Sequence, residues 1–374
     1  MMESKRLGIF VFYDVSGVVD QYVEVLLDGL LAVLDKLVIV VNGNIIKKSK
    51  QKLVKYSHFV FERENVGFDA GGYKDALLDY LVHEDWKQWD EIVLCNDTFY
   101  GPIFPWQRIF SKMQQDEETD FWGLSRYPGN DNGNSGSDYP SHIQTYFLVC
   151  KKKMILSPFF WRFWEEMKYP LSRSEATNNF EVRFTTYFID NGFCGKAYTD
   201  VCDCNISLEH GGSPYIYYAY ELLKEFQFPV IKRNALSIIN FERAKKTLDF
   251  ADKETEYDVA IIYNHLKRLA IDKSIKSMNP LQLEVFYNTH SRIFIYGCGE
   301  YGRNIAAYFK FRHWDFAGFL VSEKQRQEEE VSVFREVEFT HNDGIILALS
   351  PKSYQEVYSF IKNDFNDSQL FTIY

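Results

Sequence analysis

The side chains that could do chemistry stand in three short segments. Residues 63–74 read RENVGFDAGGYK, residues 96–102 read NDTFYGP and residues 181–185 read EVRFT. The first segment combines basic side chains with glycines, a composition that suits a diphosphate. The second offers a carboxylate beside amide and hydroxyl oxygens, which are ligands for a hard divalent cation. The third begins with an acid that could remove the proton of a reacting hydroxyl.

The first segment has two interpretations. Arg63 and Lys74 supply positive charge, and Gly67, Gly71 and Gly72 permit a close approach of the backbone. A helix predicted to begin at Gly71 would present free N–H groups to an anion. The same residues are equally compatible with a glycine-rich turn that carries incidental charges.

The other two segments also have a structural alternative. Asp97 is the one carboxylate of its segment, between Asn96 and Thr98. It could hold Mg²⁺ or Mn²⁺, or the three residues could form an Asx turn that ends a strand. Glu181 is predicted to open a helix, where an acid also stabilises the helix dipole without doing chemistry.

The segments are positioned by predicted strands. Short β-branched and aromatic runs predict strands at residues 7–13, 37–41, 58–62 and 91–95, with helices between them. Alternating strands and helices indicate an α/β fold with a mostly parallel sheet covered on both faces. Ligands of such sheets lie beyond the carboxyl ends of the strands, and the first two segments follow predicted strands directly.

Composition narrows the class of protein. The chain has 374 residues and a formal net charge of −10, which disfavours a nucleic-acid partner. Six cysteines form no disulfide or zinc pattern. No apolar run reaches about 18 residues, so the protein is predicted to be soluble or peripheral to a membrane. The lysine-rich residues 47–55 are predicted to form a solvated helix face, with contact to an anionic membrane surface as the alternative.

The C-terminal part has a different character. Residues 241–289 are predicted to be a helical connector, and residues 290–374 a small Rossmann-like α/β domain. Gly297, Gly299 and Gly302 form a G-x-G-x-x-G pattern between a predicted strand and a predicted helix. They are a possible second nucleotide site. The alternative is a degenerate module for packing or oligomerisation, because only half of a dinucleotide-binding fold fits in this length.

Seven ordered segments within about residues 5–240 resemble the rhamnan synthesis protein F family, itself similar to inverting glycosyltransferases of the GT-A fold. Two departures accompany the resemblance: the Asp-x-Asp metal motif reads Asn96-Asp97-Thr98 here, and the usual Glu-Asp pair reads Glu181-Val182. The segments are RENVGFDAGGYKDAL (63–77), NDTFYGP (96–102), DFWGLSR (120–126), HIQTYFLVCKK (142–152), SPFFWRFWEEM (157–167), E-x-x-F-T with a downstream G-F (181–193) and FPVIKRNAL (228–236).

The resemblance implies a GT-A-like domain over residues 1–240. Its implied activity is transfer of L-rhamnose, with inversion, from dTDP-L-rhamnose to a lipid-linked precursor of a cell-surface polysaccharide. Such an enzyme would work in the cytoplasm, at the inner face of the cell membrane. The alternatives are an oxidoreductase or epimerase that modifies a nucleotide sugar, and a non-catalytic scaffold of a polysaccharide-assembly complex.

The resemblance also implies roles for single residues. Glu181 would be the general base, with His142 as second choice and Asp69 as a further candidate. Gln144 and Tyr146 would contact sugar hydroxyls, and Asp97 would hold the metal if one is used. The donor would be bound by Asn42, Arg63, Asn65, Gly67, Asp69, Gly71, Gly72, Lys74, Asn96 and Asp97.

Overall fold

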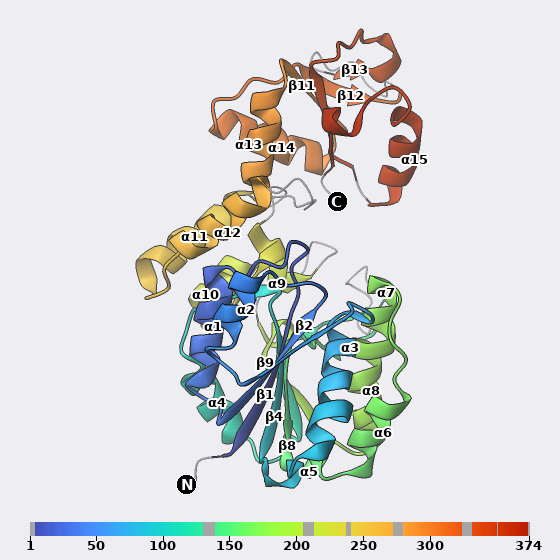
Figure 1. The fold of residues 1–374 in the computed structure, drawn as a ribbon. Coiled ribbons are helices and arrows are strands. Elements are labelled where there is room, and N and C mark those ends of the chain that lie inside the picture. Colours follow the sequence, from blue (N-terminus) through green and yellow to red (C-terminus); the bar gives the residue numbers. More distant parts are fainter. Residues whose placement is uncertain are drawn as a thin grey trace. The chain divides into compact units, whose positions relative to one another are not determined.

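The chain folds into two compact units. The computed structural model describes residues 4–129, 139–204, 213–236, 241–271, 280–323, 331–349 and 351–372. Unit 1 comprises Met1–Arg233 with Thr247–Ile261, and unit 2 comprises Asn234–Lys246 with Ile262–Tyr374 (Figure 1). The predicted domain boundary after residue 240 falls at residues 237–240, outside the described residues, so the division 1–240, 241–289 and 290–374 stays a prediction.

Unit 1 is built on a mixed sheet with the order β3-β2-β1-β4-β8-β6-β7, in which β9 also pairs with β6. Strands β3, β2, β1 and β4 are parallel neighbours, whereas β8 runs antiparallel to β4 and β6. The α/β prediction with a mostly parallel sheet is confirmed. The strands are β1 (Arg6–Phe12), β2 (Lys36–Asn42), β3 (Phe59–Arg63), β4 (Glu91–Asn96), β6 (Phe121–Tyr127), β7 (His142–Ile143), β8 (Phe147–Lys151) and β9 (Gly195–Asp200).

Helices cover both faces of this sheet (Figure 1). On one face α1 buries the apolar stripe that its spacing predicts, with Val23, Leu26 and Leu30 at most 1% exposed. On the other face α3, α6 and α8 share an aromatic-rich core with β1, β4 and β8. The helices are α1 (Gln21–Leu31), α2 (Lys47–Leu53), α3 (Phe68–Asp75), α4 (Trp106–Gln114), α5 (Lys152–Ile155), α6 (Pro158–Glu166), α8 (Arg183–Asp190), α9 (Pro214–Tyr217) and α10 (Ala219–Phe226).

A small antiparallel pair brings a distant segment to the end of β4. Strand β5 (Phe99–Tyr100) pairs with β10 (Ile231–Lys232), and Lys232 stands opposite Phe99. The backbone N–H of Arg233 then donates to Thr98 O at 3.1 Å. Residues 232 and 233 therefore lie beside the turn that follows β4, although more than a hundred residues separate them along the chain.

Helix α3 begins earlier than predicted. It starts at Phe68 with Gly67 as its N-cap, whose φ of 78° is a left-handed conformation that favours glycine. The N–H of Gly71 donates to Gly67 O at 2.8 Å, so Gly71 lies inside the helix and offers no free N–H to an anion. A Cβ at Gly71 would lie 2.2 Å from Val66 O, so close packing explains this glycine.

Glu181 does not open a helix, contrary to the prediction. The chain is helical from α7 (Arg173–Ala176) through the π-helical segment η4 (Thr177–Val182) into α8. Glu181 therefore lies in the middle of a continuous helical stretch, and stabilisation of a helix N-terminus does not account for it. Short π-helical stretches within helices frequently occur at functional sites.

Unit 2 contains a parallel sheet with the order β13-β12-β11-β14-β15. The predicted strand, glycine turn and helix are confirmed at residues 292–311. Gly297 has a φ of 104°, and a Cβ at Gly302 would lie 1.9 Å from Gly297 O. A Cβ at Gly299 would meet nothing within 4 Å. The elements are β11 (Arg292–Tyr296), α14 (Glu300–Phe311), β12 (Gly318–Val321), β13 (Val331–Val333), β14 (Asp343–Leu347), α15 (Pro351–Ile361) and β15 (Leu370–Thr372).

The segment predicted as a connector contains the helices α11 (Phe241–Glu254), α12 (Ala260–Ile271) and α13 (Pro280–Thr289). Part of it, residues 272–279, lies outside the described residues. Among the helices that the structure describes, none is both long enough and apolar enough to span a membrane.

Candidate functional site

Polar side chains from five elements of unit 1 gather beyond the carboxyl end of β4. We call this group the β4-end site and define it by six residues. Two of its side-chain contacts are a hydrogen bond from Asn96 Nδ2 to Asp69 Oδ2 at 2.7 Å and an approach of His142 Nε2 to within 3.5 Å of Glu181 Oε2. The residues are Asp69 on α3, Asn96 on β4, His142 on β7, Tyr146 just before β8, Glu181 on η4 and Lys232 on β10.

Glu181 and His142 form the pair best suited to moving a proton. The Glu181 side chain is 27% exposed, whereas that of His142 is 2% exposed. His142 Nδ1 lies 2.8 Å from Pro140 O, and a carbonyl oxygen only accepts, so Nδ1 carries the hydrogen. In the neutral ring Nε2 then keeps its lone pair, which can accept a hydrogen bond from Glu181 when that carboxyl has taken up a proton. The structure thus brings together the two predicted base candidates.

Asp69 is a third acid-base group of the site. Burial, together with the nearby Glu181 charge, raises the pKa of its carboxyl to about 6, while the hydrogen bond from Asn96 acts in the opposite direction. Its other oxygen accepts from the N–H of Ala70 at 3.0 Å. A carboxyl that titrates near neutral pH in a polar cluster is a candidate for proton transfer.

Lys232 places a cation in the same cluster. Its Nζ lies 3.2 Å from the centroid of the Tyr146 ring. Burial lowers the pKa of this ammonium to about 8, although Glu181 and Asp69 both raise it. Lys232 belongs to the family-like segment FPVIKRNAL (228–236), and the sequence predicts no role for it. The available indication was the adjacent pair Lys232-Arg233 directly after an apolar run.

The predicted sugar-contacting residues lie beside this cation. Ser125 Oγ is 2.9 Å from Gln144 Oε1 and 2.8 Å from the Tyr146 hydroxyl. Asn96 N also donates to Tyr146 O at 3.1 Å, which ties the segment to the end of β4. Tyr146 thus belongs to the site, Gln144 is linked to it through Ser125, and contact of either residue with a sugar stays a prediction.

The basic residues of the glycine-rich turn are engaged within the protein. Arg63 donates to Asp75 Oδ2 at 2.5 Å, to Asn42 Oδ1 at 2.6 Å and to Val66 O at 2.8 Å. Lys74 donates to the carbonyls of Glu165 and Met167 at 3.1 and 2.6 Å. These contacts hold α3 and its turn in place and leave few donors for a ligand.

Most of the other predicted donor-binding residues of this turn are also engaged within the protein. Asn42 is 2% exposed, and its Nδ2 donates to Phe68 O at 2.8 Å. Asn65 is exposed. A Cβ at Gly72 would lie 2.8 Å from the Val11 side chain, so this glycine, like Gly67 and Gly71, lets α3 pack closely. Direct binding of a donor by the turn stays a prediction.

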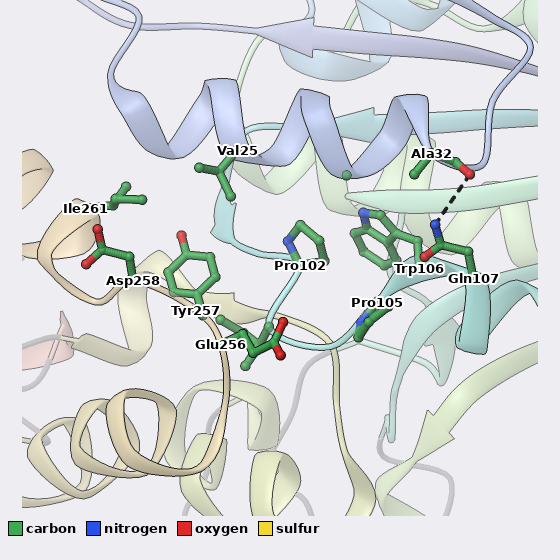
Figure 2. Close-up of a pocket in the computed structure, with 12 residues that line it drawn as sticks. Val25, Ala32, Pro102, Pro105, Trp106, Gln107, Glu256, Tyr257, Asp258 and Ile261 are labelled. Carbon is green, nitrogen blue, oxygen red and sulfur yellow. Dashed lines mark hydrogen bonds between the residues drawn. The ribbon is translucent and has the colours of Figure 1, made fainter.

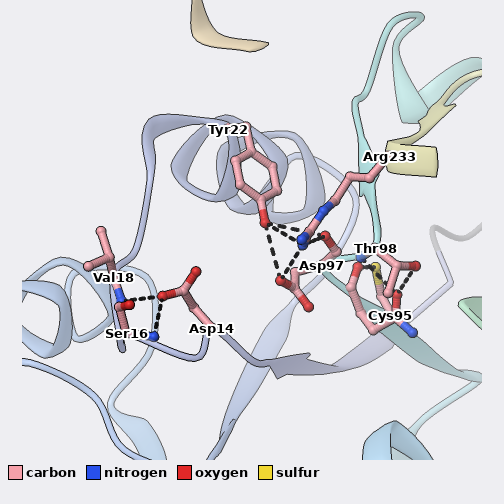
Figure 3. A network of polar contacts seen from close by, with 9 residues as sticks. Asp14, Ser16, Val18, Tyr22, Cys95, Asp97, Thr98 and Arg233 are labelled. Carbon is pink, nitrogen blue, oxygen red and sulfur yellow. Dashed lines mark hydrogen bonds and ion pairs between the residues drawn. The ribbon is translucent and has the colours of Figure 1, made fainter. Parts of the chain in front are cut away.

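Asp97 lies next to the β4-end site and faces a cation of the protein. It is 5% exposed, and its Oδ2 accepts from Arg233 Nη1 and from the Tyr22 hydroxyl, both at 3.2 Å (Figure 3). Burial raises the pKa of Asp97, and the Arg233 guanidinium opposes that shift.

The donor set around Asp97 does not fit a divalent cation. Hard cations require several oxygen ligands, whereas this carboxylate already faces a guanidinium. Within the described ranges no three His, Cys, Asp or Glu side chains are placed to hold a metal together. The chemistry of these residues therefore offers no support for the metal site suggested at Asp97.

A pocket elsewhere in unit 1 does not coincide with the site. It has a volume of about 390 Å³ and lies between α1, the segment around Pro102 and Trp106, and the segment around Tyr257 (Figure 2). Its walls are mainly apolar, and none of the predicted site residues lines it.

Comparison with known proteins gives a family and distant relatives. Residues 37–292, more than half of the chain, match the model of a family described as rhamnan synthesis protein F. "Uncharacterized protein y4gN" of Sinorhizobium fredii is 24% identical over 192 residues, which are 51% of this chain and 47% of that protein. "Virulence protein VirA" of Vibrio anguillarum is 27% identical over 140 residues, 37% of this chain and 42% of that protein.

The match to each of these curated relatives thus covers less than half of the relative's length. Among solved structures, 4-diphosphocytidyl-2C-methyl-D-erythritol synthase from Anaerococcus prevotii aligns with a TM-score of 0.34 and 15% identity. That alignment covers 52% of this chain and 87% of the synthase.

Proposed function

The chain belongs to the rhamnan synthesis protein F family, and we propose that its unit 1 is an inverting glycosyltransferase that uses a nucleotide-sugar donor. The observation that carries the proposal is the Glu181 carboxylate at the β4-end site, partly exposed and backed by His142 Nε2 at 3.5 Å. An acceptor hydroxyl needs such a base because its own pKa lies far above 7. The position of these residues beyond the carboxyl end of β4, where α/β proteins commonly bind ligands, supports the proposal.

The proposed reaction is a single displacement. The acceptor oxygen attacks the anomeric carbon, the bond from that carbon to the diphosphate oxygen breaks, and its electron pair leaves with the diphosphate. Glu181 accepts the acceptor's proton as the new bond forms. Once Glu181 has taken this proton, its O–H can donate to His142 Nε2, because the Nδ1–H of that ring is fixed on Pro140 O. Asp69 is the alternative base.

We further propose L-rhamnose, carried by dTDP, as the sugar, and a lipid-linked polysaccharide precursor as the acceptor. The family description supports this choice. It would place the enzyme in the cytoplasm at the inner face of the cell membrane. In the lysine-rich segment, predicted to be a solvated helix face with membrane contact as the alternative, Lys50 and Lys52 pair with Glu62 and Glu24 at 2.7 and 2.6 Å.

A donor panel tests the proposal. The chain is incubated with dTDP-L-rhamnose, UDP-glucose and a GDP-sugar, and both the melting temperature and the slow hydrolysis of each donor are measured. We expect the largest shift and the fastest hydrolysis with dTDP-L-rhamnose. A preference for UDP-glucose would overturn the rhamnose assignment and keep the transferase class. Absence of both binding and hydrolysis with every donor would overturn the class itself.

A further inference from the structure

The proposed reaction leaves a diphosphate whose negative charge must be stabilised, and the residues at Asp97 do not fit a metal ion. We propose that Lys232 and Arg233 bind the diphosphate of the donor and supply the positive charge that a divalent cation would otherwise supply. This inference rests on the proposed function and adds the binding groups and the independence from metal.

The backbone places both cations where the diphosphate would lie. Pairing of β10 with β5 sets Lys232 opposite Phe99, and the N–H of Arg233 donates to Thr98 O at 3.1 Å. Both residues thus flank the turn at the end of β4, with Lys232 on the side of Glu181 and Arg233 on the side of Asp97. A negatively charged ligand bound at this edge of the sheet would lie next to both cations.

Lys232 is a cation without a fixed acceptor. Its Nζ contacts the face of the Tyr146 ring, and in the part of the chain that the structure describes it has no hydrogen bond or ion pair within 4.0 Å. A partly buried ammonium held against an aromatic ring keeps its three N–H donors for a ligand. Phosphate oxygens are the acceptors that match such a group.

Arg233 is held in a fixed orientation with donors to spare. Only its Nη1 has partners among the described residues: the Tyr22 hydroxyl at 3.1 Å, Asp97 O at 3.3 Å and Asp97 Oδ2 at 3.2 Å. The side chain is 31% exposed, and its Nε and Nη2 have no hydrogen-bond partner among the described residues. Asp97 is therefore a positioning residue for Arg233, which Figure 3 shows pointing into the polar network.

A buried hydroxyl near the site, that of Tyr73, also has no hydrogen-bond partner among the described residues. It lies within the electrostatic reach of Asp69, Asp97 and Glu181. A buried donor left unpaired costs stability, so such groups in native proteins usually meet water or ligand. By contrast, the donors of Arg63 and Lys74 already have acceptors.

Binding of dTDP and of thymidine to the full-length chain separates charge recognition from base recognition. Affinities are measured by calorimetry in excess EDTA and again in Mg²⁺. We expect the wild-type Kd for dTDP to change less than about threefold between the two conditions. Lys232→Met should weaken dTDP at least about tenfold, as loss of a charge-assisted hydrogen bond does, and leave thymidine binding within about threefold.

Two further variants guard against unfolding and nonspecific effects. Lys224→Met removes an exposed cation that also lies over a tyrosine ring, that of Tyr220, and should leave dTDP binding unchanged. The double variant Asp97→Asn/Arg233→Gln avoids leaving a buried charge unpaired and should also lose at least about tenfold in dTDP affinity. Lys232→Arg, which keeps the charge, should retain binding.

The outcomes are distinct. If Lys232→Met folds and binds dTDP like the wild type, or if EDTA abolishes binding by the wild type, the inference is overturned and the transferase proposal survives. If Lys232→Met does not fold, the double variant decides in the same way. If the wild type binds none of dTDP, UDP and GDP, the proposed function fails, and this inference fails with it.

Discussion

Two regions of unit 1 carry a pair of basic residues, and they use them differently. In the turn after β3, Arg63 and Lys74 donate hydrogen bonds to Asp75, Asn42 and backbone carbonyls. At the corner formed by β10, Lys232 has no hydrogen bond within the described residues, and Arg233 uses one nitrogen. A basic residue can bind a ligand only with the N–H donors that the fold leaves unpaired. Glycines nearby in the sequence do not show whether such donors are left.

The difference has an energetic side. Removing one partner of an ion pair that is sequestered from water, such as Arg63 with Asp75, destabilises the fold because the other partner is left as an uncompensated charge. An unpaired ammonium such as Lys232 costs stability in the ligand-free protein. Mutations in the first region are therefore expected to lower the free energy of unfolding. Mutations in the second region are expected to weaken ligand binding.

The largest expected effect is on the rate of sugar transfer, and it arises at Glu181 and not at either pair of cations. Removing the acceptor's proton is a separate task from stabilising the charge of the diphosphate. Glu181→Gln keeps the size of the side chain but cannot accept a proton. We expect kcat for sugar transfer to fall at least about 100-fold, while donor affinity changes by less than about 1 kcal/mol. Glu165→Gln, at an exposed acid on α6, is the matched control. Near-normal transfer by Glu181→Gln would move the base to His142 or Asp69.

The next effect concerns stability and sharpens the comparison directly. Arg63→Met removes the donors of Asp75, Asn42 and Val66 O, and the paired side chains are only 11% and 18% exposed. We expect the free energy of unfolding in urea to fall by about 3 kcal/mol. Lys232→Met, the same kind of substitution at the corner, should cost no stability. The comparison breaks if the two variants exchange these results.

A smaller effect is a pH dependence of binding that comes from Lys232. Its pKa of about 8 means that the free protein loses this charge as the pH rises through 8, whereas Asp69, with a pKa of about 6, is already ionised there. We expect dTDP affinity to fall up to about tenfold between pH 7 and pH 9.5. Lys232→Arg should flatten the curve, because a guanidinium stays charged. An unchanged curve would assign the titration to another group.

The sequence was sufficient to predict the regular strands and helices of the molecule. It was insufficient to predict which charged side chains are paired within the protein and which are not. Apolar runs and helical spacing predict β1, β2, β4 and α1 because burial decides those elements. The family resemblance also directs attention to Glu181 and His142. The role of Arg63 depends on Asp75, Asn42 and Val66 O meeting it in space, which no local pattern encodes.

The missed residues and boundaries have similar causes. Lys232 and Arg233 reach the end of β4 only through the β10–β5 pair, a contact between residues far apart in the chain. Helix α3 begins at Phe68 because Gly67 adopts a left-handed conformation. Gly71 and Gly72 are typical of a turn in the sequence, whereas in the structure they lie inside the helix and allow close packing there.

The smallest expected effect involves Asp69, which belongs to α3 beside the turn but acts on Lys232 at the corner. Its pKa in the folded protein, about 6, lies above the ordinary value of 3.8, so the folded state holds the proton more tightly than the unfolded state. Its contribution to stability is therefore full below pH 3.8 and is lost as the pH rises through about 6.

Asp69→Asn removes this titration and keeps an oxygen that can accept from Asn96 Nδ2. Relative to the wild type, the variant should gain roughly 1 kcal/mol in the free energy of unfolding between pH 5 and pH 8. Urea titrations of both proteins at the two pH values measure that difference, and the ligand-free state must be used because a bound diphosphate adds charge. A difference that stays constant with pH would show that Asp69 is ionised throughout. Lys232 would then face two carboxylates, Asp69 and Glu181, even at pH 5, where a pKa of about 6 would keep Asp69 mostly protonated, and the attraction for a diphosphate at that pH would be weaker.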